Sequence, residues 1–99
     1  MVRTPSVQRD LRWLGPKDSR WLLKEAALRL RNDPTVQTQN LKALRENSVA
    51  ERELRLRGKY RVLFNVDLQR REITLVVVGL KRGEALYVRG KRFADHRSY

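Results

Sequence analysis

The sequence predicts an α+β fold, in which an N-terminal helical hairpin packs on one face of a small, mainly antiparallel β-sheet. Two observations predict it. Apolar residues recur at helical spacing in the first third of the chain, and they alternate with polar residues at strand spacing from residue 53 onward. At 99 residues the chain suits one domain. We expect this domain to span 1–99, with 93–99 as a flexible tail.

The first two predicted elements are helices. Over residues 5–14, one helical face carries Val7, Leu11 and Leu14, and Gly15-Pro16 ends this helix and opens the next. A second helix is expected over residues 17–32, before the Pro at position 34. Its apolar stripe consists of Leu22, Leu23, Ala26, Ala27 and Leu30.

The rest of the chain predicts strands. Residues 35–50 are polar with an apolar dip over 41–44, which indicates a loop with a short turn of helix. Strands are then expected over 53–57, 60–66 and 73–78, with a short further strand over 85–89. The third is apolar throughout, as a strand covered on both faces would be, and Gly79 should end it. The expected core consists of Val62, Phe64, Leu75 and Val77 packed against Leu23, Ala27 and Leu30.

Alternation along the strands predicts which side chains point away from the helices. Leu54 and Leu56 should face the helices. The opposite face then carries charged residues from two neighbouring strands, namely Glu53, Arg55, Arg57 and Arg61. Arg82 should stand at the rim of this face, where the central strand ends. Several Arg residues on one open sheet face predict a cleft that binds phosphate.

Charge is the strongest signal in the composition. Lys and Arg number 23 against 11 acidic residues, a net charge of +12, and 17 of the 23 are Arg. The planar guanidinium pairs with phosphate through two hydrogen bonds and stacks on bases, so a polyanion is the expected partner. The alternative is a solvated basic surface that serves solubility.

Several classes of function are disfavoured by the composition. The chain has no Cys and a single His, which leaves no disulfide, no thiol nucleophile and no ligand set for a transition metal. We therefore expect no metal and no cofactor. No apolar run approaches the roughly 20 residues of a membrane span, and the N-terminus lacks the apolar core of a signal peptide. A cytoplasmic protein without a membrane partner is the expectation.

The strand region resembles a known family. The segment ELRLRGKYRVLF, residues 53–64, resembles the paired middle strands of RelE/ParE toxins, where an alternating basic strand, a Gly-containing turn and a Tyr-Arg pair lead into an apolar strand. The run Gly79-Leu80-Lys81-Arg82, followed by Tyr87, resembles the family's next strand and its terminal basic-aromatic element. Where RelE carries Lys residues on the basic strand, this chain has Glu53 and Arg.

The resemblance implies a toxin of a type II toxin-antitoxin system, held silent by a cognate antitoxin protein. RelE-like members are metal-independent endoribonucleases that cleave translated mRNA on the ribosome and so inhibit translation. ParE-like members share the fold and inhibit DNA gyrase instead. The Tyr60-Arg61 and Lys81-Arg82 elements with Tyr87 favour the RelE-like function, and a gyrase inhibitor or a toxin relative without activity is the alternative.

The resemblance also assigns roles to residues. Arg61 and Arg82 would stabilise the charge that develops on the scissile phosphate, and Tyr87 would stack on a base or orient a proton. Glu53 is a candidate base, with the alternative that it only pairs with a neighbouring Arg. His96, in the expected tail, is a further acid–base candidate. The remaining RNA contacts would be Arg55, Arg57, Lys81 and Arg89.

The two Trp residues lie in the predicted helices. We expect Trp13 and Trp21 in the core or in contact with the antitoxin, rather than as platforms for bases.

Overall fold

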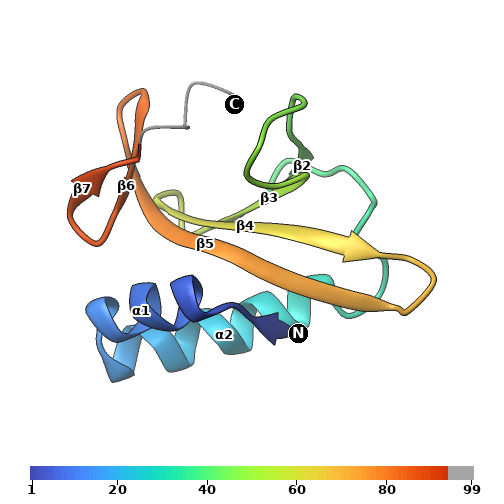
Figure 1. Cartoon of the computed structure of the whole chain (residues 1–99), viewed down its shortest axis with the longest axis horizontal. Helices are drawn as coiled ribbons and strands as arrows, with labels where there is room; N and C mark the ends of the chain where they lie inside the picture. The colour runs from blue at the N-terminus through green and yellow to red at the C-terminus, as the bar shows by residue number, and fades with distance from the viewer. Residues whose placement is uncertain (94–99) are drawn as a thin grey trace.

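Two helices form one layer of the molecule and a seven-stranded sheet forms the other, as the computed structural model shows for residues 1–93 (Figure 1). A short strand, β1 (Val2–Arg3), precedes helices α1 (Pro5–Leu14) and α2 (Pro16–Leu30). Both helices lie on the same side of the sheet (Figure 1). The predicted α+β fold, with a helical hairpin on one sheet face, is confirmed.

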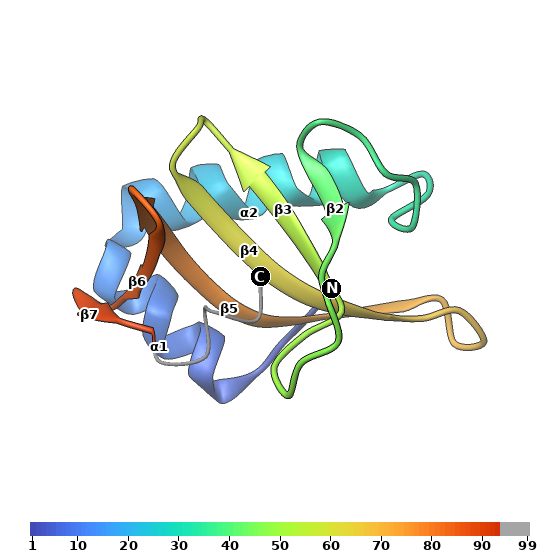
Figure 2. The same ribbon diagram turned by 90° about the horizontal axis from the view of Figure 1, so that it is seen from above.

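The sheet is built mainly from hairpins between consecutive strands. Its antiparallel strands lie in chain order: β2 (Leu41–Ala43), β3 (Arg52–Leu56), β4 (Tyr60–Asp67), β5 (Glu72–Arg82), β6 (Ala85–Val88) and β7 (Lys91–Arg92). Strand β1 pairs with β5 in parallel. Seen from above, the strands cross the two helices, and the β4–β5 hairpin projects beyond them (Figure 2).

Local sequence explains where the helices begin and end. The Thr4 hydroxyl caps α1 by accepting a hydrogen bond from the Val7 N–H at 3.2 Å, and Pro5 fits the first turn, where no N–H is needed. Gly15 ends the helix with a φ of 96°, and its N–H donates to the Leu11 carbonyl at 3.2 Å. Pro16 then opens α2 at once, which keeps the two helices adjacent.

The main core lies between the helices and the sheet. Leu22, Ala26 and Leu30 of α2 are buried there, together with Val7 and Leu11 of α1. The predicted contacts of Leu23 and Ala27 are wrong in part, since Leu23 is half-buried and Ala27 is exposed. The two residues follow Leu22 and Ala26 by one position each, which turns them away from the sheet by about 100° around the helix axis.

A β-bulge divides the apolar residues of β5 between the two sheet faces. Leu63 of β4 lies opposite Val77, whereas Phe64 lies opposite Leu75, so Val76 is the extra residue. Leu75 therefore packs toward the helices, as predicted, but Val77 lies on the other face, contrary to the prediction. Strict alternation could not predict the face on which Val77 lies, because the bulge shifts the alternation by one residue.

We call the sheet face away from the helices the outer face. A second, smaller apolar cluster lies there. Its buried members are Ala50, Leu63, Val77 and Leu86. Phe93 packs against this cluster, and its N–H donates to the Leu86 carbonyl at 2.8 Å. Phe93 is thus part of the folded body, whereas the rest of the predicted tail, 94–99, lies outside the described residues.

The short turn of helix expected near residues 41–44 is wrong, since this segment is the edge strand β2. Hydrogen bonds tie its ends to β3: the Arg55 N–H donates to the Asn40 carbonyl at 2.7 Å, and the Leu44 N–H to the Glu51 carbonyl at 2.8 Å. Leu41 is buried opposite Leu54. Pairing with β3, which the local sequence does not reveal, determines that this segment is a strand.

The sequence predicted that Gly79 would end the central strand, but Gly79 lies within this strand. A Cβ atom at this position would lie 2.6 Å from the Tyr87 carbonyl oxygen, closer than real Cβ contacts come. Glycine here therefore permits the close approach of β6. Strand β5 continues to Arg82 and pairs there with Ala85, across the turn at Gly83.

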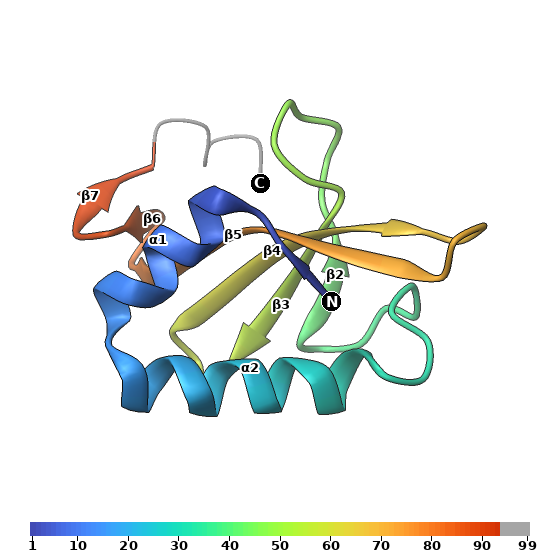
Figure 3. The ribbon, with the colours of Figure 1, turned by 60° about the horizontal axis from the view of Figure 1, so that its bottom comes forward.

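A buried carboxylate from α1 completes the edge of β5. On this edge, β1 pairs at Thr74 and Leu75, and β6 pairs only from Leu80 onward. Between these strands, the Val78 N–H donates to Asp10 Oδ2 at 3.1 Å. Figure 3 shows α1 beside this part of the sheet. The side chain thus satisfies a backbone group that neither strand reaches.

Candidate nucleic-acid interface

An ionic cluster from β3 and β4 lies on the outer face. Arg55 and Arg61 are directly opposite each other in the register, and Glu53 lies two pairs further along, opposite Leu63 and on the same face. Glu53 Oε1 is 2.6 Å from Arg55 Nε and 3.6 Å from Arg61 Nε. Sequence alternation placed these three residues on one face, and the structure brings them into contact.

Arg61 is held by the backbone as well as by Glu53. Its Nη1 donates to the carbonyls of Gly58 and Tyr60, at 3.0 Å and 3.1 Å. Its side chain is only 9% exposed, whereas that of Arg55 is 37% exposed. Arg61 is therefore fixed in one orientation, and Arg55 is the guanidinium of the pair that solvent reaches more easily.

Glu53 is enclosed within this cluster. Its side chain is 1% exposed, and its Oε2 accepts no hydrogen bond from the described residues. A carboxylate so placed neutralises part of the charge of the two guanidiniums. Its geometry fits the ion-pair alternative, because the carboxylate has almost no surface through which to meet a substrate hydroxyl.

Arg57 does not share this cluster. It lies in the β3–β4 turn with a φ of 49°, followed by Gly58 at 74°. This left-handed turn directs the Arg57 guanidinium onto the Trp21 ring, 3.9 Å from its centroid, on the helix side. The Trp21 ring in turn lies 5.1 Å from that of Tyr60. The predicted RNA contact is thus engaged in a cation–π contact that ties the turn to α2.

The structure also separates Arg82 and Tyr87 from Arg61. Gly79 lies opposite Arg61, so alternation along β5 puts Lys81 on the outer face and Arg82 on the helix side. Tyr87 lies opposite Leu80, also on the helix side, and the Arg82 guanidinium lies 5.7 Å from its ring centroid. Of the two basic residues at the end of β5, Lys81 is therefore the one that accompanies Arg61.

Arg89 is engaged with α1. Its Nε lies 3.1 Å from Asp10 Oδ1, and the Asp10 side chain is 1% exposed. Burial raises the pKa of the Asp10 carboxyl above its ordinary value, and the Val78 hydrogen bond and the charges of Arg89 and Arg9 offset this rise only in part. Asp10 was not a predicted site residue, since Asp in an amphipathic helix usually faces solvent.

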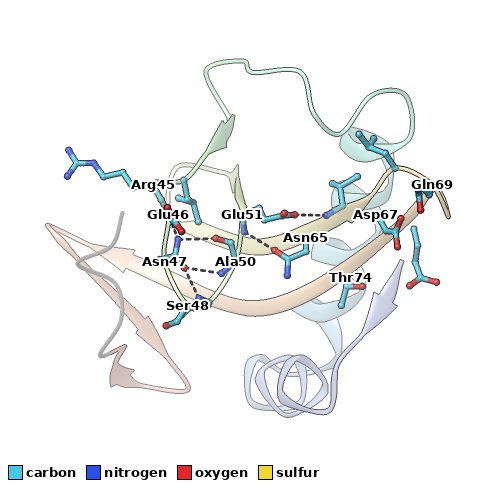
Figure 4. A pocket seen from close by; sticks show the side chains of 15 residues that line it. Arg45, Glu46, Asn47, Ser48, Ala50, Glu51, Asn65, Asp67, Gln69 and Thr74 are labelled. Carbon is cyan, nitrogen blue, oxygen red and sulfur yellow. Dashed lines mark hydrogen bonds between the residues drawn. The ribbon is translucent and has the colours of Figure 1, made fainter.

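A hollow of about 840 Å³ occupies the other end of the outer face (Figure 4). Asn47 orders its loop: its Oδ1 accepts from the N–H groups of Val49 and Ala50, and Asn65 Oδ1 accepts from the Glu51 N–H. Its charged lining is mostly acidic: Arg45, Glu46, Glu51, Asp67 and Glu72. This hollow contains none of the predicted site residues, and its charge disfavours phosphate.

The predictions for Trp13 and His96 have different outcomes. Trp13 is 53% exposed, so a place in the core is wrong for this residue, and its contact with the antitoxin stays a prediction. Trp13 is two positions from Leu11 and one from Leu14, so helical spacing turns it about 160° from the first and about 100° from the second, away from the apolar face of α1. His96 lies outside the described residues. Within residues 1–93, no cluster of His, Asp and Glu side chains could hold a metal ion.

No helix in the described part of the chain is both long and apolar enough to cross a membrane. Neither a scan against protein-family models nor searches of curated proteins and of solved structures found a match for this chain.

Proposed function

We propose that the protein is a type II toxin of the RelE-like kind, a ribosome-dependent endoribonuclease that cleaves translated mRNA. The observation that carries this proposal is the outer-face cluster, where Arg55 and Arg61 converge on one buried carboxylate. A partly exposed guanidinium next to a second, fixed one suits a phosphodiester, because the two can neutralise the charge that builds on its oxygens during cleavage.

The position of each Arg suggests its role. Arg55 is open enough to meet a phosphate, and Arg61 lies behind it, fixed by two backbone carbonyls. Lys81 lies on the same face at the end of β5, where it can extend the contact to a neighbouring phosphate. Arg82 and Tyr87, on the helix side, would contact RNA only where it passes the sheet edge.

Attack by a 2′-OH needs a base for its proton and precise alignment with the scissile phosphate. Since Glu53 is enclosed and paired, the described residues contribute charge stabilisation more clearly than proton transfer. This geometry fits a reaction that depends on the ribosome, which would align the message for attack. Such a reaction takes place in the cytoplasm.

The test is primer extension on a translated message, with and without ribosomes. Arg61→Ala and Arg55→Ala should each lower cleavage by about 10²–10³, by analogy with loss of an oxyanion-hole donor. Arg29→Ala, on the exposed side of α2, should cleave like the wild type. Arg55 is the safer probe, because its side chain is partly exposed and its loss disturbs the fold least.

Undiminished cleavage by both variants would remove the cluster from the site. No cleavage by the wild type, together with blocked DNA supercoiling, would replace this proposal with the ParE-like gyrase inhibitor.

A toxin of this kind needs a cognate antitoxin. The Arg55–Arg61 end of the outer face suits an acidic segment that folds across it and covers Arg55, with an association rate that falls as salt increases. Co-expression with the product of the adjacent gene should give a complex in gel filtration. Absence of a complex would contradict this part of the proposal.

A further inference from the structure

Trp13 is the most exposed aromatic residue in the described part of the chain, with an exposed fraction of 53%. It lies near the end of α1, where the β6–β7 turn meets the helix (Figure 3). Its ring contacts this turn, since a Cβ atom at Gly90 would lie 3.2 Å from Trp13 Cζ2. One part of the indole is thus supported by backbone, and the rest faces solvent.

The turn is held in place beneath the indole. Arg89 and Gly90 both have positive φ angles, 51° and 77°, which fits a tight two-residue hairpin turn. The ion pair of Arg89 with the buried Asp10 fixes this hairpin to α1. The indole is therefore oriented before any ligand binds, which lowers the entropy lost on binding.

Exposed cations lie on α1 and on the β6–β7 hairpin, the two elements that hold the indole. Arg9 precedes Trp13 by one helical turn on the same face of α1. The exposed β7 residue Arg92 lies opposite Tyr87 on β6, on the helix side, whereas Lys91 lies opposite Val88, which packs on the outer face. The half-buried Tyr87 ring already carries the Arg82 guanidinium. The single acid in this group, Asp10, is buried and paired with Arg89.

This mixture favours nucleic acid over an apolar protein partner. The other large hydrophobic residues that are exposed lie on other elements: Met1, Val2, Leu28, Val36 and Leu68. Trp13 is thus the only one of these exposed apolar side chains on α1, with no second large hydrophobic side chain exposed on its element to form an apolar patch. A flat ring among Arg and Lys is the usual means of binding unpaired bases with their phosphates.

We propose that Trp13 and the β6–β7 hairpin form a second RNA-binding surface, on which an unpaired base stacks against the indole. Arg9 and Arg92 bind the phosphates on either side of that base. This inference deepens the proposed function and rests on it for the class of ligand, single-stranded RNA. The surface is distinct from the Arg55–Arg61 cluster, because α1 lies on the other side of the sheet.

The test measures binding of a labelled oligouridylate by fluorescence anisotropy, with no ribosome present. Trp13→Ala should weaken binding about 5- to 100-fold, the effect of losing one stacked base. Trp13→Phe should retain most of the affinity, since a phenyl ring still stacks. Leu68→Ala, at an exposed apolar position on the β4–β5 hairpin, is the matched control and should bind like the wild type.

Two further readouts separate stacking from general charge attraction. In a Trp21→Phe background, Trp13 is the sole Trp, and oligouridylate should quench its fluorescence. Arg92→Gln should reduce the slope of log affinity against log salt by about one phosphate contact, while the Trp13 variants leave this slope unchanged. Circular dichroism melts check that each variant is folded.

The outcomes are distinguishable from those of the cleavage test. Loss of affinity in Trp13→Ala without any cleavage by the wild type would support this surface and overturn the catalytic proposal. Unchanged affinity and no quenching, with cleavage that depends on Arg55, would overturn this surface alone. Loss of affinity to the same degree in Trp13→Phe would overturn stacking as its cause.

Discussion

The two faces of the sheet are built on different principles. The helix-covered face buries an apolar cluster of twelve residues, among which Phe64 and Leu22 are the largest fully buried side chains. The outer face buries four apolar residues and, beside them, the charged side chains of Glu53 and Arg61. The first face supplies stability, and the second retains charge at the cost of apolar packing. This contrast is what a binding surface built on a stable scaffold requires.

The largest expected effect lies on the helix-covered face. Phe64→Ala should lower the free energy of unfolding by about 3–5 kcal/mol, because it leaves a cavity in a fully buried part of the core. Leu63→Ala, the neighbouring residue on the outer face, should cost less, since loop residues can close around the smaller gap. Urea unfolding of both variants measures the difference. Equal losses would show that the two faces contribute alike.

The next effect tests the buried charge. Glu53→Gln should lower the free energy of unfolding by about 1–3 kcal/mol, because two guanidiniums lose their counter-ion. The loss stays below that of a fully enclosed pair, since Arg55 can turn toward water. Urea unfolding at low and high salt measures it. An increase in stability would mean that Glu53 serves only to position the Arg pair.

A third effect concerns Asp10, which links the two layers. Its folded-state pKa is raised, so the folded protein binds a proton more tightly than the unfolded chain does. The stability that this proton contributes is complete below the unfolded pKa of 3.8 and is lost as pH rises through the folded pKa. The free energy of unfolding of the wild type, minus that of Asp10→Asn, should therefore fall as pH rises.

Parallel urea melts of the two proteins, taken between about pH 3 and pH 7, measure this difference. The comparison cancels the other carboxyl groups, which both proteins share. A difference that rises with pH would mean that the pairing with Arg89 outweighs burial.

The smallest effect is expected on the solvent side of α2. Arg29 lies 4.0 Å from Glu25 in an exposed pair one turn apart. Arg29→Ala should change the free energy of unfolding by less than about 0.5 kcal/mol. Thermal melts check this value. A large loss would show that the helical layer depends on surface charge, and the contrast between the faces would need revision.

The sequence predicted the helical hairpin, the antiparallel order of the strands and the face shared by Glu53, Arg55 and Arg61, because each follows from local periodicity. It misplaced Val77, because a bulge adds one residue to β5 and inverts the alternation beyond it. The bulge depends on pairing between strands, which no local pattern encodes.

The candidate site was predicted only in part, because turns and strand pairing also decide on which face its residues lie. Arg57 leaves the outer face because its turn adopts a positive φ, which few non-glycine residues do. Arg82 and Tyr87 fall on the helix side, because β5 extends past Gly79 and keeps alternating. An exposed Trp beside a basic hairpin turn could be found only once α1 and Gly90 were seen in contact.

The parallel pairing of β1 with β5 has a consequence for folding. Val2 lies beside Thr74, so the first strand joins the sheet only after a loop of nearly the whole domain has closed. During synthesis, α1 and α2 emerge long before β5, and their apolar faces stay uncovered in that interval. Closure of this long loop should limit the folding rate. Until it closes, the β5 edge between Thr74 and Val78 is open to pairing with another chain, and the nascent protein is most prone to aggregate.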